Sequence, residues 1–593
     1  MAARPSQEDF AEQISLLSQQ SSKETLYPRP DFTALRRYVK APAPGPRITS
    51  DGSSAASFTS LSHDETITNA FAVIHDLQSG TPVYFPSASL TEFSDYKPPG
   101  AARGSLVFMR GYARPEWLGA IGEKYKVDLE LYQRHLQNKP FAAGGRDCYS
   151  TPCLPSASTR VFQLTIPTIW ERGTDFNPCE PEDLERDRQH MAKSLVEYNR
   201  QMRNGVAGGA ESMVSNCLQF SKKTYVLEQT VTVEVGPPST GGSWRAIIWM
   251  DSGKDLSRGV HGPWSPPPGS RAWETYFVPV VVQGPSATRI VSSDTLRPGN
   301  LRPEPSPATL RPQLSRHSTL RPQAATSPPW QLNHHHQGQG SSTPVAHHTP
   351  AEEWRANQNV CLLPLRYGSC LDKNVAGNDA LYAISELLRF AAAAEAQFFS
   401  LVDERIQQEL SFVGRSNAGG RQYAISLLNL NYIKTSLRLH AASIAGTVEL
   451  LGGRGMLNWP RVSAPTSDFQ VAERMAALLD ADFAYLLRQA EALAHQCDRG
   501  IDTLANSSAL EQSRRSADNA MRVEKLTMLA SIFIPLSFVC SIWGMNFREM
   551  GSGQMSIWMW FATAGPVIIF SFIIYRMELI KKWVAKARDN NEE

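Results

Sequence analysis

The chain has 593 residues, a formal net charge of +2 and 20% charged residues. A chain of this length normally forms several domains, and a net charge so close to zero argues against a nucleic-acid partner. Its eight cysteines are scattered and include no Cys-x-x-Cys pair. They therefore predict neither a zinc finger nor a disulfide framework, and fit reduced thiols in a cytosolic domain better.

The first 99 residues are rich in Ser, Pro, Thr and Ala and have weak hydrophobic periodicity. This composition predicts a mostly disordered N-terminal region over residues 1–99. Within it we expect a helix near residues 7–19 and some order around residues 70–85.

Residues 100–291 predict a cytosolic α/β domain, because candidate strands alternate there with candidate helices. The segment 224–235 alternates Val with Thr and Glu at a period of two, which is typical of a half-solvated strand. Strands are expected at 106–109, 160–166, 224–235 and 246–250, and helices at 116–121, 129–137 and 181–204.

Residues 292–352 predict a disordered linker, because proline at this density blocks regular structure. A Leu-Arg-Pro triplet recurs in it, beginning at Leu296, Leu301, Leu310 and Leu320. Histidines gather at 334–336 and 347–348, and could form a metal-collecting tract, although a solvated low-complexity linker is the favoured interpretation. The proline-spaced arginines could contact acidic lipid headgroups or kinases, and the sequence does not decide between them.

Residues 353–525 predict a helical stalk. Helices are expected at 378–412 and 421–451, and a last one begins near residues 466–468, which offer a plausible N-cap. Its apolar residues recur at alternating spacings of three and four, the pattern of a helix packed against partners. They are Met475, Leu479, Phe483, Leu486, Ala490, Leu493, Cys497, Ile501 and Leu504. If this helix continued into the apolar run that follows, it would exceed about 100 Å at ~1.5 Å per residue.

Two uncharged apolar runs, 526–543 and 555–575, are each long enough to cross a bilayer as a helix. Basic residues flank them outside the hairpin: Arg514, Arg515, Arg522, Lys525, Arg576, Lys581, Lys582, Lys586 and Arg588. The loop 544–554 carries only Arg548, balanced by Glu549. The positive-inside rule then predicts a multi-pass membrane protein with both termini and the basic tail 576–593 in the cytosol. We expect the plasma membrane, and a buried hairpin of a soluble core is the disfavoured alternative.

One face of the first run suits the lining of a pore. Its residues are mostly small or hydroxylated and follow three-four spacing: Val523, Thr527, Ala530, Ile534, Ser537 and Ser541. Close helix packing in the membrane would use similar residues, and the two interpretations overlap. No acidic residue lies within either run, whereas a proton-coupled carrier would normally have one, so downhill conduction is favoured.

The tripeptide Gly544-Met545-Asn546 ends the first apolar run and is a candidate ion-selectivity site. Mg²⁺ gives up its water reluctantly, so a pore for it should offer neutral oxygens to the hydration shell. Asn546 supplies an amide oxygen and Gly544 allows close backbone approach. Several copies around one axis would form a ring of acceptors. Alone, the tripeptide would fit an ordinary helix C-cap.

The segment 525–538 together with Gly544-Met545-Asn546-Phe547 resembles the CorA family of divalent-cation channels. Lys581-Lys582-Trp583 is also family-like, and residues 107–136 resemble the family's amino-terminal α/β segment less specifically. The resemblance implies a homopentamer with a cytosolic funnel, and apolar constrictions at Leu526 and Ile534 that can dewet. The long N-terminal region and the proline-rich insert are similar to the fungal branch. Trp543 stands where tyrosine or phenylalanine is usual.

These observations predict a magnesium channel in a lipid bilayer. Alternatives are a zinc or nickel transporter of the same fold, which the resemblance at Met545 disfavours, and a non-conducting membrane-anchored scaffold. No Gly-rich phosphate loop, nucleophile elbow or paired metal-ligand motif supports an enzyme. Cytosolic Mg²⁺ could close the channel by relieving repulsion between crowded acids of the stalk, although a solvated helix face is the simpler interpretation for each. The acids are Glu473, Asp480, Asp482, Glu491, Asp498 and Asp502.

Overall fold

The structure is a computed structural model, and it describes only part of the chain. The described residues are 7–19, 32–39, 70–97, 103–136, 160–173, 182–203, 212–238, 242–253, 256, 260–265, 275–282, 359–412, 420–543, 548, 554 and 556–589. They belong almost entirely to one compact unit, Met1–Val281 with Ala356–Glu593. The predicted linker, with its Leu-Arg-Pro triplets and both histidine groups, lies outside the described residues, as do Cys148, Cys153 and Cys179.

A mixed eight-stranded sheet forms the amino-terminal part. Its strands are β1 (Ala70–Asp76), β2 (Pro82–Pro86), β3 (Gly104–Arg110), β4 (Val161–Arg172), β5 (Asn216–Gln219), β6 (Thr224–Val235), β7 (Trp244–Met250) and β8 (Thr275–Phe277). The order is β2-β1-β3-β7-β6-β4-β8, with β5 paired to β6. β3 and β7 are parallel, and the other paired strands are antiparallel. The four predicted strands correspond to β3, β4, β6 and β7.

The sheet begins at Ala70, ahead of the boundary that the sequence placed at residue 100. β1 pairs with both β2 and β3, so it is an integral strand. All seven of its residues are buried. A strand covered on both faces shows no alternation of polar and apolar residues, which explains the weak periodicity of this region.

β6 corrects a second expectation. Its Val-Thr-Glu alternation predicted a half-solvated strand, yet Thr232 and Glu234 are buried. The Thr232 hydroxyl lies 2.9 Å from Nδ1 of His135, and the Glu234 carboxylate accepts a hydrogen bond from the Asp128 amide at 3.1 Å. Polar side chains on this face meet polar partners from the covering layer instead of water, and the sequence pattern cannot distinguish the two.

Helices cover one face of the sheet: α1 (Gln7–Ser18), α2 (Phe32–Val39), α4 (Leu90–Asp95), α5 (Pro115–Tyr125), α6 (Leu129–Leu136) and α7 (Glu185–Arg203). α1 confirms the helix expected near residues 7–19. It belongs to the core, because Ile14 is fully buried and the Phe10 ring meets Tyr132 edge-on at 6.0 Å. β7 shows how the layers divide: Ile247 faces this helical layer, whereas Ile248 faces the opposite one.

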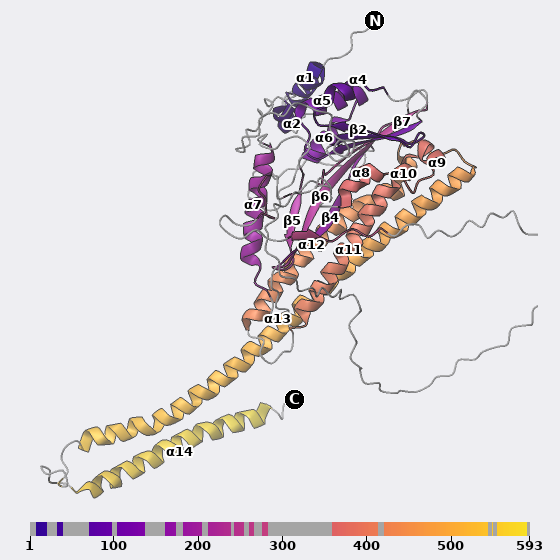
Figure 1. The fold of residues 1–593 in the computed structure, drawn as a ribbon. Coiled ribbons are helices and arrows are strands. Elements are labelled where there is room, and N and C mark those ends of the chain that lie inside the picture. The colour runs from indigo at the N-terminus through magenta and orange to yellow at the C-terminus, as the bar shows by residue number, and fades with distance from the viewer. Residues whose placement is uncertain are drawn as a thin grey trace, which may run out of the picture. The chain divides into compact units, whose positions relative to one another are not determined.

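The opposite face packs against the carboxy-terminal helices. After η1 (Asn359–Leu362), these are α8 (Leu363–Arg366), α9 (Lys373–Asn378), α10 (Ala380–Ala383), α11 (Ser385–Leu410), α12 (Gly420–Gly452), η2 (Gly453–Met456), α13 (Ser467–Trp543) and α14 (Ile557–Asp589). α11, α12 and the first half of α13 lie side by side along the sheet (Figure 1). The chain is thus a mixed α/β region followed by long helices.

The helix predicted over residues 378–412 is interrupted. α10 ends at Ala383 and α11 begins at Ser385. The hydroxyl of Tyr367 donates to the Ala383 carbonyl at 2.8 Å, and Asp379 caps α10 by accepting from the Tyr382 amide. The Tyr367 contact comes from outside this helical segment, so the alanine- and leucine-rich sequence of the segment could not reveal the break.

α13 confirms the long continuous helix. It spans 77 residues, about 115 Å at ~1.5 Å per residue. Thr466 accepts a hydrogen bond from the Phe469 amide at 3.1 Å, as the predicted N-cap requires. Its apolar seam packs into the core with α11 and α12: Leu479, Phe483, Ala490 and Cys497 are among the buried members.

Candidate functional site

The predicted selectivity residues Gly544, Met545 and Asn546 lie outside the described residues, as do Phe547 and Glu549. The structure describes the two helix ends that flank them. α13 ends at Trp543 and α14 begins at Ile557. The Trp543 indole donates to the Thr563 hydroxyl at 3.1 Å, so a side-chain hydrogen bond joins the helices close to this loop.

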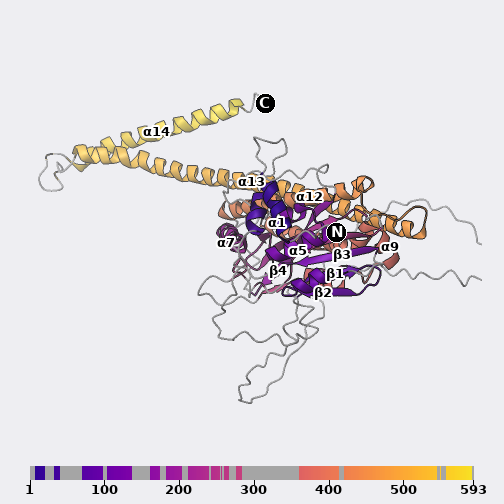
Figure 2. The same ribbon diagram turned by 90° about the horizontal axis from the view of Figure 1, so that it is seen from above.

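The two helices also pack on each other through small apolar side chains. Val539 of α13 and Ala564 of α14 are both buried, at 4% and 3% exposure. A small residue such as alanine lets two helix backbones approach closely. In both ribbon views α14 turns back beside the end of α13 (Figures 1 and 2).

The predicted pore-lining residues lie on the other side of α13. A helix turns about 100° per residue, which places Val539 and Trp543 opposite the stripe that contains Thr527 and Ser541. Most of the stripe is exposed in the single chain, and Ala530 is half-buried. Its members are Val523, Leu526, Thr527, Ala530, Ile534, Ser537 and Ser541. The apolar members Val523, Leu526 and Ile534 are 61%, 66% and 66% exposed.

The hydroxyl groups of this stripe share one hydrogen-bonding arrangement. Thr527 donates to the Val523 carbonyl at 2.8 Å, Ser537 to the Ile534 carbonyl at 2.8 Å and Ser541 to the Ser537 carbonyl at 2.9 Å. Each hydroxyl hydrogen is therefore used within the helix. Each oxygen can therefore still accept a hydrogen bond from its surroundings.

Much of the remaining hairpin surface is apolar. Among the described residues, one helix, Ser467–Trp543, contains a stretch long and apolar enough to cross a membrane, and Ile557–Ile573 forms a shorter apolar stretch. Only 6% of this apolar stretch of α13 is buried inside the chain. Large side chains such as Phe533, Phe538 and Phe570 are 59%, 65% and 65% exposed. An exposed apolar surface of this extent is typical of a membrane or protein contact.

The predicted regulatory acids do not converge within one chain. Glu473 accepts a hydrogen bond from Arg461 at 3.1 Å and also pairs with Arg454. Asp498 pairs with Lys434, and this hydrogen bond lowers the pKa of Asp498. The remaining members, Asp480, Asp482, Glu491 and Asp502, are exposed. Across the described ranges, no three His, Cys, Asp or Glu side chains form a group able to hold a metal ion.

A buried cluster that the sequence reasoning missed joins the sheet to the helices. Nδ1 of His440 in α12 lies 2.8 Å from Glu395 of α11, and its Nε2 lies 3.0 Å from Glu228 of β6. Burial alone would lower the pKa of His440, but the two carboxylates outweigh it and raise the pKa to about 10. The carboxylates bind opposite edges of the ring, so they bridge three elements. The sequence contained one signal for this cluster: His440 and Glu395 each lie within an apolar helical stretch.

The comparisons with known proteins concern the carboxy-terminal helices. The family model described as CorA-like Mg2+ transporter protein matches residues 456–576, an interval that contains all of α13, the loop and the apolar part of α14. The search of the curated proteins finds no match. The matched family consists of transporters rather than enzymes, and it supports transport of divalent cations. Through residues 456–576, this chain is similar to the CorA-like Mg2+ transporter family.

Proposed function

We propose that the chain is one subunit of a homopentameric Mg²⁺ channel. In this proposal α13 and α14 cross the bilayer as a hairpin, and Gly544, Met545 and Asn546 form the selectivity site at the mouth. Both termini lie in the cytosol and the membrane is the plasma membrane. The observation that carries the proposal is the hydroxyl-bearing stripe of α13 on the face opposite α14.

The chemistry of this stripe fits a hydrated cation. Mg²⁺ keeps much of its water shell when proteins bind it, and water oxygens that face the ion leave their hydrogens pointing outward. A lining for such an ion must accept hydrogen bonds. The oxygens of Thr527, Ser537 and Ser541 have their own hydrogens engaged in the helix, so they can act as acceptors. The Asn546 amide oxygen would extend the same chemistry at the mouth.

The exposed apolar residues of the stripe would control conduction. Rings of Leu526 and Ile534 around a fivefold axis would form constrictions that exclude water and ions when narrow. The other exposed apolar side chains, including Phe533 and Phe538, would contact neighbouring subunits and lipid. Each subunit thus offers one face that carries hydroxyl groups and several that carry none, as a subunit at the centre of a membrane pore requires.

The length of α14 supports the proposed topology. Its 33 residues extend about 50 Å at ~1.5 Å per residue, more than the ~30 Å hydrocarbon core. The helix would therefore leave the membrane before it ends at Asp589. The residues beyond Tyr575 include Lys581, Lys582 and Lys586, and a basic extension of this kind favours the cytosolic side.

Cytosolic Mg²⁺ would regulate the channel by negative feedback. Among the residues that the structure describes, the exposed acids Asp480, Glu491 and Asp502 belong to no group able to hold a metal ion, and in this proposal an ion bridges them to another subunit. Binding that favours the closed arrangement would then shift the population of channels toward it.

The test is Mg²⁺ flux into liposomes that contain the purified protein. Asn546→Ala should abolish flux and leave the oligomer intact, because the substitution removes the acceptor without altering the α13–α14 contact. Gln554→Ala is the matched control, since it removes an exposed amide of the same loop outside the motif. Flux at the wild-type rate in Asn546→Ala liposomes would contradict the proposal. Flux of Zn²⁺ or Ni²⁺ in place of Mg²⁺ would instead support a zinc or nickel transporter. Absence of any flux would support a non-conducting scaffold.

A further inference from the structure

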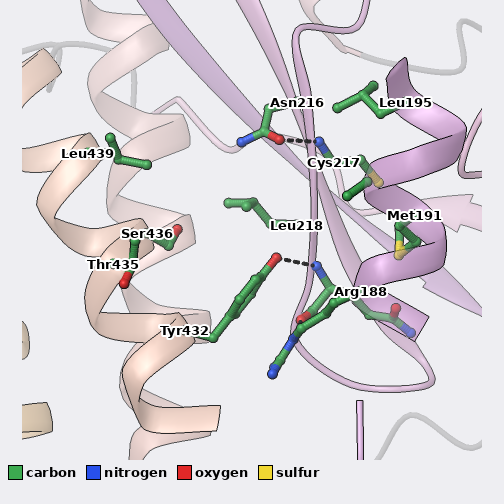
Figure 3. A pocket seen from close by; sticks show the side chains of 12 residues that line it. Arg188, Met191, Leu195, Asn216, Cys217, Leu218, Tyr432, Thr435, Ser436 and Leu439 are labelled. Carbon is green, nitrogen blue, oxygen red and sulfur yellow. Dashed lines mark hydrogen bonds between the residues drawn. The ribbon is translucent and has the colours of Figure 1, made fainter. Parts of the chain in front are cut away.

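A cavity of about 130 Å³ lies between α7, β5 and α12, remote in sequence from the predicted ion path (Figure 3). Met191, Leu195 and Leu218 form apolar walls together with Leu439. Leu439 is 43% exposed and Thr435 is exposed, so these two mark the rim through which a molecule could enter.

The cavity lies at an edge of the sheet, where β5 pairs with one strand among the described residues. β5 pairs with β6, and on its other edge side chains replace a neighbouring strand. The Gln219 amide donates to the Tyr432 hydroxyl at 3.2 Å, and the Gln219 carbonyl accepts from Nε of Arg188 at 3.1 Å. The Cys217 amide donates to its neighbour Asn216 at 2.9 Å. Between these contacts and α12 the space is left open, as Figure 3 shows.

Two residues that line the cavity each have a buried polar side-chain atom without a partner. Ser436 is 3% exposed and Gln219 is 2% exposed. Neither Ser436 Oγ nor Gln219 Oε1 has a hydrogen-bond partner among the described residues. Buried hydroxyl and amide groups are nearly always satisfied in folded proteins. Their position on the wall of a cavity therefore indicates that something in the cavity satisfies them.

The volume of the cavity and the chemistry of its walls limit which molecule can occupy it. A single water needs only ~10–15 Å³ of such space, whereas an apolar cavity of ~150 Å³ binds benzene. A cationic side chain is also close, but the Arg188 guanidinium is already engaged. Its Nη1 donates to Asn429 at 2.8 Å, and its Cζ lies over the Tyr432 ring, 3.8 Å from the centroid. An anionic head group would have to compete with these contacts.

We propose that this cavity binds a small uncharged molecule with an apolar body about the size of a benzene ring and one hydroxyl group. The body would contact Leu218 and Leu439, which lie on the same side of β5 as Ser436 (Figure 3). The hydroxyl would hydrogen-bond with Ser436, whose own hydroxyl can donate or accept. The inference goes beyond the proposed transport function and does not depend on it.

Phenol is the probe, titrated into the full-length protein in detergent and followed by calorimetry and by the melting temperature. Wild type should bind phenol saturably at one site per chain, with a rise in melting temperature. Ser436→Ala should weaken this binding about fivefold to tenfold, the usual effect of losing one hydrogen bond. Ser436→Leu should abolish binding by filling the cavity. Ser385→Ala is the matched control, because Ser385 is also fully buried with an unpartnered hydroxyl but does not line the cavity.

Comparison of Ser436→Ala with Ser385→Ala cancels any partitioning of phenol into detergent. Equal phenol affinity in wild type and both alanine variants would overturn the proposal. So would tighter binding of benzoate than of phenol, since it would assign the site to an anion anchored on Arg188. Absence of saturable binding by phenol in the folded wild type would show that water alone fills the cavity. None of these readouts uses ion flux, so the proposal can fail while the transport function stands.

Discussion

Removing the imidazole of His440 should strongly destabilise the sheet and the helices that pack on it. The side chain lies between Glu395 and Glu228, 2.8 and 3.0 Å from their carboxylates, and is 3% exposed. His440→Ala leaves two like charges facing an empty, buried space. Breaking a buried pair in this way typically costs about 3–5 kcal/mol. The replacement His440→Gln, which keeps hydrogen bonds but no charge, should cost less.

The pH dependence of unfolding gives a second, independent value for the free energy by which His440 stabilises the fold. The folded-state pKa of His440 is raised from 6.5 to about 10, so its contribution is complete below pH 6.5 and is lost as the pH rises through 10. A shift of this size corresponds to an upper limit of ~5 kcal/mol at 1.36 kcal/mol per pKa unit. The net value is smaller, because burial raises the pKa of Glu395 and so opposes its ionisation in the fold.

Thermal unfolding of the purified protein between pH 6 and 10 tests this reasoning. His440→Ala should lower the melting temperature by at least ~5 °C near pH 7, and the difference from wild type should shrink toward pH 10. His495→Ala is the control, since His495 is exposed on α13 and should change little. A loss below ~1 °C, or a difference that does not depend on pH, would refute the assignment of a charged bridge.

Three further outcomes are expected. Deletion of residues 296–348 should leave the oligomer and Mg²⁺ flux unchanged, because a proline-rich segment contributes little to a core; loss of either in size-exclusion or flux measurements would assign this segment a role. In a Cys540→Ser background, Ser537→Cys should react with a thiol reagent applied from the loop side and lose flux, whereas Val539→Cys, at the buried α14 contact, should stay unmodified; the reverse pattern would place the pore on the other face. Millimolar Mg²⁺ should raise the melting temperature and protect α13 from proteolysis, and identical digestion with a chelator would rule out regulation through the stalk acids.

Helical features near the carboxy terminus could be read from the chain alone, because they depend on local composition and period. The three-four spacing from Leu479 to Leu504 appears in the structure as the buried seam of α13. The N-cap at Thr466 and the continuity of the helix into the apolar run follow from short-range rules. The Gly544–Asn546 motif remains a prediction, since it lies outside the described residues.

Other features depend on which segments meet in three dimensions, and local pattern carries little information about that. β1 is buried on both faces and shows no polar alternation, whereas β6 alternates although its polar residues Thr232 and Glu234 are buried, so in neither strand does the pattern indicate solvent exposure. The break after Ala383 is set by Tyr367, and the bridge at His440 requires Glu228, a residue 212 positions away on the sheet. Such contacts form because the helices pack on the sheet and exclude water, which makes each buried polar group dependent on a distant partner.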